Sequence, residues 1–401
     1  MNPTSIAIVK STVPLIQEVG TDLTKHFYGL LFEENPELKN VFNMVSQANG
    51  RQQSTLASSI LSYAAHIDKL EAIGPEVHRI AAKHFSLDVQ PEHYPIVGRN
   101  LLKAIREVLG EDIATNEVID AWAEAYELLA SILIGAEANL YDNSQEGQGW
   151  LGFKDFSVVK KVKESSEITS FYLAPLDEKP LPKYKAGQFI SVRIKDPDLE
   201  FTEIRQYSLS DAHSEDVYRI SVKAETSGDE NTPDGLVSNH LHGKVEEGDI
   251  VPVHMPGGEF FVKDNDRPVV LISGGVGITP VLGMLNELIL KRDSRKISWL
   301  HGTRSKDAHA FGGHINMLKN DLSNLSTATF YEDIYGAEKG KDYDHHGYIT
   351  ADKIKQYCSL DADFFFCGPL PFMHAIHQQL TGLNVPEEQL HYEVFGPSST
   401  L

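Results

Sequence analysis

The pattern of apolar and polar residues along the chain changes twice. Up to about residue 142, apolar residues recur at steps of three and four, as at Trp122, Tyr126 and Leu129, which is the spacing of amphipathic helices. Three dipeptides divide this part into helices of ordinary length: Asn35-Pro36, Gly74-Pro75 and Gln90-Pro91. We therefore predict an all-α domain over residues 1–142.

The next part of the chain is predicted to form strands. Residues 143–152 are polar and contain glycine, which is typical of a linker. Beyond them, short β-branched or aromatic runs alternate with turn residues; the runs cover 156–162, 168–173, 188–194, 206–209 and 218–222. Closely spaced short strands of this kind indicate an antiparallel β-barrel over residues 153–263.

The pattern changes again near Asp264. Residues 269–273 form a continuous apolar run that is followed by a glycine turn and a helical pattern, and 297–300 and 364–366 are further buried-strand candidates. Buried strands that alternate with helices indicate a parallel α/β sheet, here over residues 264–401. The predicted fold is therefore multidomain: all-α, then an antiparallel β-barrel, then an α/β domain with a parallel sheet.

The composition is that of a globular protein from a reducing compartment. The 401 residues carry a net charge of −21, which argues against binding to nucleic acid or to an anionic membrane surface. Two cysteines, Cys358 and Cys367, are too few for a disulfide scaffold. The N-terminus has no signal-peptide pattern, and no apolar run reaches the ~18 residues that span a bilayer. We expect a cytoplasmic protein with no nucleic-acid partner and no stable membrane insertion.

One of the 17 histidines lies in a context that suggests a ligand. Val77, Ile80 and Ala81 share a helical face with His84. A buried imidazole needs partners for its nitrogens. A haem iron would supply one partner, and the apolar face would pack against the porphyrin. Without this context, a histidine on a helix is an ordinary surface or core residue.

The helical part resembles a globin of the flavohaemoglobin type. The resemblance rests on five stretches: His26-Phe27-Tyr28, Asn35-Pro36-Glu37-Leu38, Val41-Phe42-Asn43-Met44, Lys83-His84 and Tyr94. It implies that His84 binds the iron of haem b and that Phe42 packs on the ring, with Lys83 in the same pocket. Tyr28 would donate a hydrogen bond to iron-bound oxygen, with Gln52 and Leu56 nearby.

The resemblance also implies a network behind the ligating histidine. Glu137 and Tyr94 would hydrogen-bond to its second nitrogen. A carboxylate there would increase the basicity of the imidazole and favour oxygen activation over storage. By residue type alone, Glu137 could equally be a solvated charge near a helix end.

The predicted barrel carries residues that suit a flavin nucleotide. Arg205-Gln206-Tyr207-Ser208 lies on a predicted strand, where Arg can bind a pyrophosphate and Tyr can stack on the isoalloxazine ring. Residues 235–241 form a turn that enters a short helix, and Val237 and Ser238 lie at its N-terminal end, which can hold a phosphate. Together with Gly187-Gln188-Phe189, they resemble the FAD-binding domain of the ferredoxin–NADP reductase superfamily. Relatives often have Tyr at the last of these positions, so a hydroxyl is missing here.

Two turns follow buried strands in the last domain. Gly275-Val276-Gly277-Ile278-Thr279-Pro280 opens a helix, with Thr279 expected as its cap; an ordinary tight turn has the same signature. Cys367-Gly368-Pro369 ends another buried run, and ligands bind at such strand ends in open α/β sheets. The pair resembles the superfamily's NAD(P)H-binding domain, which places Cys367 near the nicotinamide. A buried structural thiol is the alternative for Cys367.

The C-terminal segment Glu393-Val394-Phe395-Gly396-Pro397 also matches the superfamily. The match implies that Phe395 covers the flavin ring and that Glu393 tunes hydride or electron transfer.

The three resemblances follow the family's order and cover nearly the whole chain. They imply a nitric oxide dioxygenase: NADH or NADPH reduces FAD, FAD reduces haem, and haem-bound O2 oxidises nitric oxide to nitrate. They are compatible with a monomer and with a lipid in the haem pocket. A haem sensor or oxygen-storage protein, and a ferric, quinone or peroxide reductase, are the alternatives. Arg304 could meet a 2′-phosphate, so the sequence leaves NADH and NADPH both open.

Overall fold

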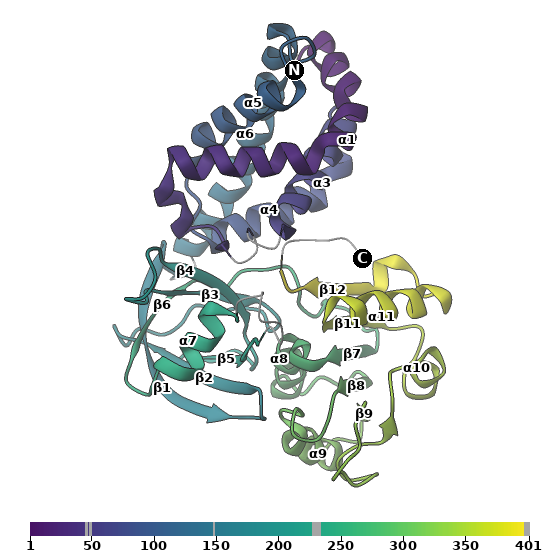
Figure 1. The fold of residues 1–401 in the computed structure, drawn as a ribbon. Helices are drawn as coiled ribbons and strands as arrows, with labels where there is room; N and C mark the ends of the chain where they lie inside the picture. The colour runs from purple at the N-terminus through teal and green to yellow at the C-terminus, as the bar shows by residue number, and fades with distance from the viewer. Residues whose placement is uncertain (45–46, 48–49, 147–148, 227–233, 397–401) are drawn as a thin grey trace. The chain divides into compact units, whose positions relative to one another are not determined.

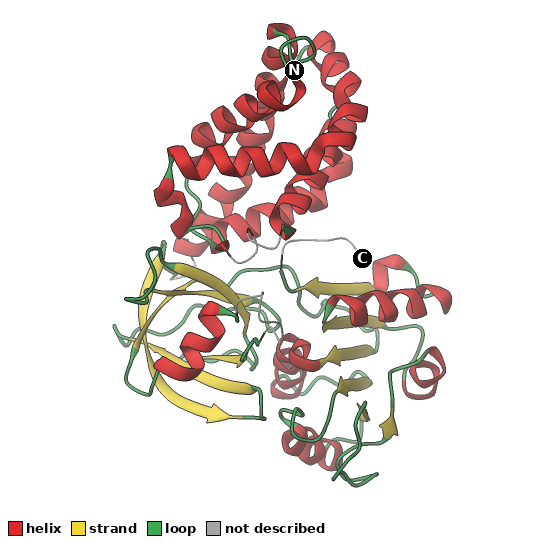
Figure 2. Cartoon of the chain, viewed as in Figure 1, coloured by secondary structure: helices red, strands yellow, loops and turns green. Residues whose placement is uncertain are grey.

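The computed structural model describes residues 1–44, 47, 50–146, 149–226 and 234–396. The chain forms two compact units: Met1–Phe153 with Ser191–Arg205, and Lys154–Ile190 with Gln206–Leu401. Figure 2 shows helices throughout the N-terminal part and both strands and helices in the remainder. No helix of the described residues combines the length and the apolar character that a membrane crossing requires.

The N-terminal part is helical, as the periodicity predicts. Its helices are α1 (Pro3–Glu34), η1 (Pro36–Asn40), α3 (Arg51–Ala65), η2 (Leu70–Ile73), α4 (Gly74–Ser86), α5 (His93–Leu109) and α6 (Asn116–Glu146). Helix α1 begins where the Asn2 side chain accepts a hydrogen bond from the Ser5 backbone at 2.9 Å, with Pro3 at the first helical position. Helix α6 continues into the segment 143–152 that the sequence suggests as a linker.

Helices α5 and α6 cross at very short range. Gly98 of α5 lies against the ring of Tyr126 on α6, so a side chain at Gly98 would collide with that ring. The Tyr126 hydroxyl donates to the Tyr94 carbonyl at 2.7 Å. This crossing fixes the relative position of the two helices that carry Tyr94 and Glu137.

The middle part forms a six-stranded sheet with the order β4-β3-β6-β1-β2-β5. The strands are β1 (Phe153–Lys163), β2 (Ile168–Pro175), β3 (Phe189–Ile194), β4 (Glu203–Ser208), β5 (Tyr218–Lys223) and β6 (Ile250–His254), and helix α7 spans Leu236–Lys244. Strand β2 pairs with β1 and with β5 in antiparallel fashion. Each strand run that the sequence predicts corresponds to one of these strands.

The C-terminal part is a parallel sheet with the order β10-β9-β8-β7-β11-β12. Its elements are β7 (Val269–Gly274), η3 (Gly275–Gly277), α8 (Ile278–Leu290), β8 (Ile297–Thr303), α9 (Gly312–Asp321), β9 (Leu325–Tyr331), β10 (His345–His346), α10 (Ala351–Tyr357), β11 (Asp363–Gly368), α11 (Leu370–Gly382), η4 (Glu387–Gln389) and β12 (Leu390–Val394). Helices α8 and α9 pack on one face, and α10 and α11 on the other (Figure 1). The predicted fold class is confirmed in all three parts.

Candidate haem, flavin and nucleotide sites

His84 is hydrogen-bonded to residues from two other helices. Its Nδ1 lies 2.8 Å from Glu137 Oε1 and 3.0 Å from the Tyr94 hydroxyl, and that hydroxyl donates to the same Glu137 oxygen at 2.5 Å. Glu137 is only 2% exposed, so these hydrogen bonds replace the contacts with water that a charged carboxylate would otherwise make. Because a carboxylate only accepts hydrogen bonds, Nδ1 carries the hydrogen and donates it. The structure thus brings together the three residues predicted for this network.

The Tyr94 hydroxyl remains a donor at neutral pH. Burial and the Glu137 carboxylate both raise the pKa of Tyr94. Tyr94 therefore stabilises the Glu137 carboxylate by donating a hydrogen bond to it, and it keeps its own proton.

This arrangement fits a haem iron on the second nitrogen of His84. With Nδ1 engaged, Nε2 is the nitrogen that can bind a metal. The His84 side chain is 33% exposed, so the ring is not sealed into the core. Across the described ranges, no group of three or more His, Cys, Asp or Glu side chains is placed to hold a metal ion.

Tyr28 lies in an aromatic cluster of the same helical core. Its ring centroid is 5.8 Å from that of Phe32 and 5.8 Å from that of Phe42. Burial raises the pKa of the Tyr28 phenol, and hydrogen bonds with Gln47 and Gln52 oppose that rise. The phenol is therefore protonated at neutral pH and can donate. Gln47 was missed by the sequence analysis, because an isolated glutamine has no recognisable pattern.

The remaining predicted pocket residues lie close to these two groups. Leu56 of α3 packs in the same apolar core as Tyr28 and Phe42, and Val77 of α4 packs there as well. Lys83 precedes His84 on α4 and is half-buried. Helix α4 therefore connects the core around Tyr28 to His84.

A close approach joins Phe189 to the C-terminal strand. Gly258, which has a φ of +108°, lies against the Phe189 ring, where any side chain would collide. A Cβ at the same position would lie 3.8 Å from Glu393 Oε1. The structure thus places Phe189 and Glu393 close to the same face of Gly258, although 204 positions separate the two residues in the sequence. Gly258 was missed, and its only sequence signal is the turn Pro256-Gly257-Gly258.

Strand β4 carries the predicted Arg-Gln-Tyr-Ser motif. The Arg205 guanidinium donates to Glu203 Oε2 at 2.8 Å, and Glu203 is only 4% exposed. Alternate residues of a strand share a face, and this spacing could have identified Glu203, which the sequence analysis missed. Ser208 is buried, and Gln206 and Tyr207 are half-buried.

The turn before α7 is held by its own side chains. The Ser238 hydroxyl donates to the Gly235 carbonyl at 3.1 Å and accepts from the Glu225 backbone at 3.3 Å. Val237 is buried. Contacts from this turn to a phosphate would therefore come from backbone N–H groups rather than from these two side chains.

The glycine loop after β7 packs against the end of β11. Gly277 approaches the Cys367 carbonyl so closely that a side chain would collide with it. Gly275 has a φ of +52°, which favours glycine. The loop and the segment Cys367-Gly368-Pro369 thus meet at the carboxyl edge of the sheet, where α/β folds bind ligands.

The expectation that Thr279 caps the following helix is wrong. The 3-10 turn η3 runs directly into α8, whose first residue is Ile278. Thr279 is therefore inside the helix, and its hydroxyl donates to the Val276 carbonyl at 3.1 Å. Pro280 lies in the first turn of α8, as expected.

Cys367 is a fully buried thiol at the same edge. It pairs in register with Ser273 of β7 on one side and with Glu393 of β12 on the other. Burial and the Glu393 carboxylate raise the pKa of the thiol well above its usual range. The structure thus supports the buried-thiol alternative, at the position where the nucleotide loop packs.

The C-terminal segment is described only in part. Val394 ends β12, Phe395 is 42% exposed, and Gly396 has a φ of +129°. Pro397, which the sequence analysis includes in the flavin site, lies outside the described residues.

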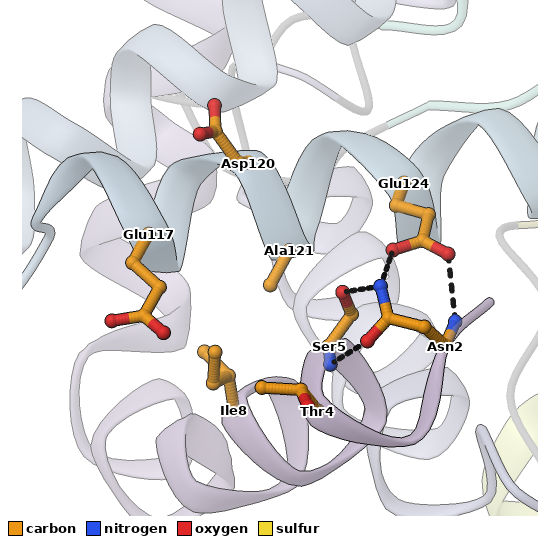
Figure 3. A pocket seen from close by; sticks show the side chains of 8 residues that line it. All are labelled: Asn2, Thr4, Ser5, Ile8, Glu117, Asp120, Ala121 and Glu124. Carbon is orange, nitrogen blue, oxygen red and sulfur yellow. Dashed lines mark hydrogen bonds between the residues drawn. The ribbon is translucent and has the colours of Figure 1, made fainter.

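A separate pocket of about 430 Å³ lies between α1 and α6 (Figure 3). It is lined by Asn2, Thr4, Ser5, Ile8, Glu117, Asp120, Ala121 and Glu124. The Asn2 backbone and side chain donate to the Glu124 carboxylate at 2.9 and 3.1 Å. No predicted haem residue lines this pocket, and its polar contacts fasten the start of α1 to α6.

Comparisons with known proteins agree with this three-part arrangement. Family models match residues 25–133 as a globin, 155–262 as an oxidoreductase FAD-binding domain and 271–378 as an oxidoreductase NAD-binding domain. A flavohemoprotein of Halalkalibacterium halodurans is 46% identical over 98% of this chain and 96% of its own length. A flavohemoprotein of Bordetella parapertussis is 47% identical over 99% of this chain and 98% of its own.

Two solved structures are also similar. The flavohemoglobin of Malassezia yamatoensis, with bound FAD and heme, has a TM-score of 0.85 and 28% identity over 98% of this chain and 99% of its own. The FAD/NAD-binding domain of a nitric oxide dioxygenase from Vibrio cholerae has a TM-score of 0.56 and 36% identity over 61% of this chain and 99% of its own.

Fold and site together define an oxidoreductase in which a haem-binding globin is joined to an FAD- and NAD-binding reductase. This combination is consistent with the hydrogen-bonded His84 and with both glycine turns. The chain belongs to the flavohemoprotein family.

Proposed function

We propose that this protein is a nitric oxide dioxygenase that uses NADH or NADPH and O2 to convert nitric oxide to nitrate. The proposal is supported by the family and by the name of the Vibrio cholerae relative. When bound, the nicotinamide, flavin and haem supply the hydride transfer, the electron transfer and the oxygen chemistry. The residues of the chain bind these groups, orient them and set their electrostatic environment.

The observation that carries the proposal is the buried carboxylate behind His84. Glu137 accepts from His84 Nδ1 at 2.8 Å and is itself held by Tyr94. A carboxylate in this position makes the imidazole a stronger electron donor than a backbone carbonyl would. That property suits oxygen activation better than reversible storage, and it disfavours the sensor and storage alternatives.

Tyr28 has the complementary role on the other side of the proposed pocket. Its protonated phenol, with Gln52 and Gln47 as partners, would donate to a ligand that carries partial negative charge. Phe42 and Leu56 would surround that ligand with apolar surface. We propose Tyr28, Tyr94 and Glu137 as the residues that support catalysis.

We propose that the flavin is held by the β4 motif, the turn before α7 and the segment from Glu393, and that the nucleotide is held by the loops after β7 and β11. The buried Glu203–Arg205 pair keeps the guanidinium in a fixed place, which would pre-organise it for a pyrophosphate. We also propose a cytoplasmic location and domain limits of 1–142, 153–263 and 264–401.

The test measures nitric oxide consumption by the full-length protein loaded with haem and FAD. In aerobic buffer with NADH, we expect rapid loss of nitric oxide with one nitrate formed for each molecule consumed. No acceleration over the sample without nucleotide would refute the proposal. Full ferric, quinone or peroxide reductase activity in His84→Ala, without nitric oxide turnover in the original protein, would instead favour the reductase alternative.

A further inference from the structure

The strand that carries the flavin motif leads directly into a contact with the first helix of the α/β part. Asp211 follows the end of β4 by three residues, and Gly283 lies in the middle of α8, the helix that starts after the glycine loop. A Cβ at Gly283 would lie 2.7 Å from the Leu209 carbonyl oxygen and 3.1 Å from that of Asp211. A larger residue at Gly283 would therefore push the two segments apart. Both segments belong to one compact unit of the chain.

Three side chains make hydrogen bonds across the same contact. Asn286 follows Gly283 on α8, and its Nδ2 donates to Asp211 Oδ1 at 2.7 Å. Its Oδ1 accepts from His314 Nε2 of α9 at 2.9 Å. Because the Asp211 carboxylate only accepts hydrogen bonds, the amide has one orientation, and His314 carries its hydrogen on Nε2. Asp211, Asn286 and His314, which we call the latch, thus join the segment after β4 to α8 and α9.

Asp211 is held in place from within the barrel. Its Oδ2 lies 3.1 Å from Arg219 Nη1, and the Arg219 side chain is only 11% exposed. The Tyr184 hydroxyl donates to the Asp211 carbonyl at 3.2 Å. The Arg219 guanidinium also lies 5.3 Å from the ring centroid of Phe311, the residue before α9. The barrel therefore sets the position of the carboxylate that Asn286 meets.

The latch fixes orientation, whereas apolar contacts supply the adhesion. Ile168 and Phe260 of the barrel part pack in the same core cluster as Leu285 of α8. Burial of apolar surface is non-directional, so these contacts hold the barrel and the α/β part together without fixing how one is rotated against the other. Hydrogen bonds weaken steeply when they are bent, so the two bonds of Asn286 fix that rotation.

The two ends of the latch lie next to the two proposed sites. Ser208, the last residue of the flavin motif, precedes Asp211 by three positions, and α8 begins at Ile278 within the glycine loop. A shift of α8 at Asn286 would therefore move the glycine loop relative to the flavin motif. Transfer between two bound groups requires reacting atoms about 3–3.5 Å apart, and a misplacement of about 1 Å can lower the rate about 100-fold.

We propose that Asn286 is a positioning residue for hydride transfer: through the latch, it sets how closely the nicotinamide approaches the flavin. This inference rests on the proposed flavin and nucleotide sites. Asn286 acts through α8 and the segment after β4, rather than by contact with either group.

The test uses the full-length protein loaded with haem and FAD. Asn286→Asp replaces the donor to Asp211 by a second carboxylate. Adding Asp211→Asn restores one donor and one acceptor, with their positions exchanged. Gly283→Ala displaces α8 by a different means. Asn316→Asp is the matched control, because Asn316 is an exposed residue of α9 whose side chain donates to the Lys341 carbonyl, at 3.2 Å, within the α/β part.

Three quantities are measured for each variant. Anaerobic stopped-flow at saturating NADH gives the limiting rate of flavin reduction. The long-wavelength charge-transfer absorbance of the reduced flavin with NAD⁺ reports how well the two rings stack. Calorimetry gives the dissociation constant of 5′-AMP, which lacks the nicotinamide half and therefore reports whether the nucleotide loops are intact.

We expect Asn286→Asp and Gly283→Ala to lower the limiting rate about 10- to 100-fold and to weaken the charge-transfer band, because the rings no longer meet at the productive distance. The dissociation constant of 5′-AMP should stay unchanged. Addition of Asp211→Asn to Asn286→Asp should recover most of the lost rate, since the pair is coupled. Asn316→Asp should change none of the three quantities.

An original rate in Asn286→Asp or in Gly283→Ala would overturn the inference. So would a loss of 5′-AMP binding that matches the loss of rate, which would indicate general damage to the α/β part. A double variant no faster than Asn286→Asp alone would overturn it as well. A flavin that neither NADH nor NADPH reduces in the original protein would overturn the proposed function, and the inference with it.

Discussion

Replacement of Glu137 by glutamine tests the central contact of the proposed haem site. The substitution keeps the size of the side chain and its ability to accept from His84 Nδ1, but it removes the charge. Glu137 is buried and lies 2.8 Å from His84, so little solvent screens the effect. We expect Glu137→Gln to weaken electron donation from the imidazole and to slow nitric oxide turnover.

The magnitude follows from the hydrogen bond that changes. Bonds to charged groups are worth about 1.5–3 kcal/mol and neutral ones about 0.5–1.5 kcal/mol, so the difference is about 1–1.5 kcal/mol. For one electron, a tenfold change in equilibrium corresponds to about 59 mV, and the iron potential should therefore rise by roughly 40–65 mV. Loss of a residue behind a metal ligand typically lowers activity about 10- to 100-fold.

The assay combines spectroelectrochemistry of the haem with the nitric oxide electrode. Glu127→Gln is the matched control, because Glu127 is an exposed residue of the same helix. Tyr94→Phe is a second variant, which should shift the iron potential in the opposite direction. It removes the donor that lies 2.5 Å from Glu137 and leaves a more basic carboxylate, so the potential should fall.

Two results would refute this reasoning. One is a potential and a turnover rate in Glu137→Gln that match those of Glu127→Gln. The other is a shift of the potential in the same direction in Glu137→Gln and Tyr94→Phe, which would indicate general loosening of the pocket rather than charge. The haem content of each variant, from its Soret absorbance, must equal that of the original protein.

Three further predictions concern other sites. Tyr28→Phe should speed O2 dissociation about 2- to 12-fold in flash photolysis, because one hydrogen bond of about 0.5–1.5 kcal/mol is lost; an unchanged rate would exclude Tyr28 as the donor. Gly277→Ala should lower the free energy of unfolding by about 1–3 kcal/mol and weaken nucleotide binding, because the Cβ of the alanine would collide with the Cys367 carbonyl. Gly313→Ala is the control: its added Cβ meets open space, so it should not weaken nucleotide binding. Burial lowers the pKa of His309 to about 4. As the pH falls, His309 is therefore protonated in the unfolded chain before it is protonated in the folded protein. The free energy of unfolding should consequently fall by about 2 kcal/mol between pH 6.5 and 4.5. His309→Gln should flatten that pH dependence in urea titrations, and a dependence as steep as the original would contradict the assignment.

Much of the architecture could be predicted because it depends on neighbours in the chain. Apolar spacing predicts secondary structure locally, whichever part of the protein a segment packs against. This holds for the three- and four-residue spacing around Trp122 and for the apolar run 269–273. The glycine loop and Cys367-Gly368-Pro369 could be placed at one edge, because parallel strands end on the same side. The boundary of α8 was missed because the 3-10 turn η3 continues into the helix without a polar cap.

The sequence by itself determined the order of the three folds and the position of the two turns that follow β7 and β11. The tertiary structure alone decided the environment of the charged groups. It brought Glu393 to Gly258 and Glu167 to Arg304, contacts that neither the pattern nor the resemblance had indicated, whereas the contact of Glu137 with His84 was expected from the resemblance. Periodicity shows which face of an element is buried but not which distant side chain meets it. Burial and charge pairing, which set proton affinity and ligand preference, therefore exist only once the chain is folded.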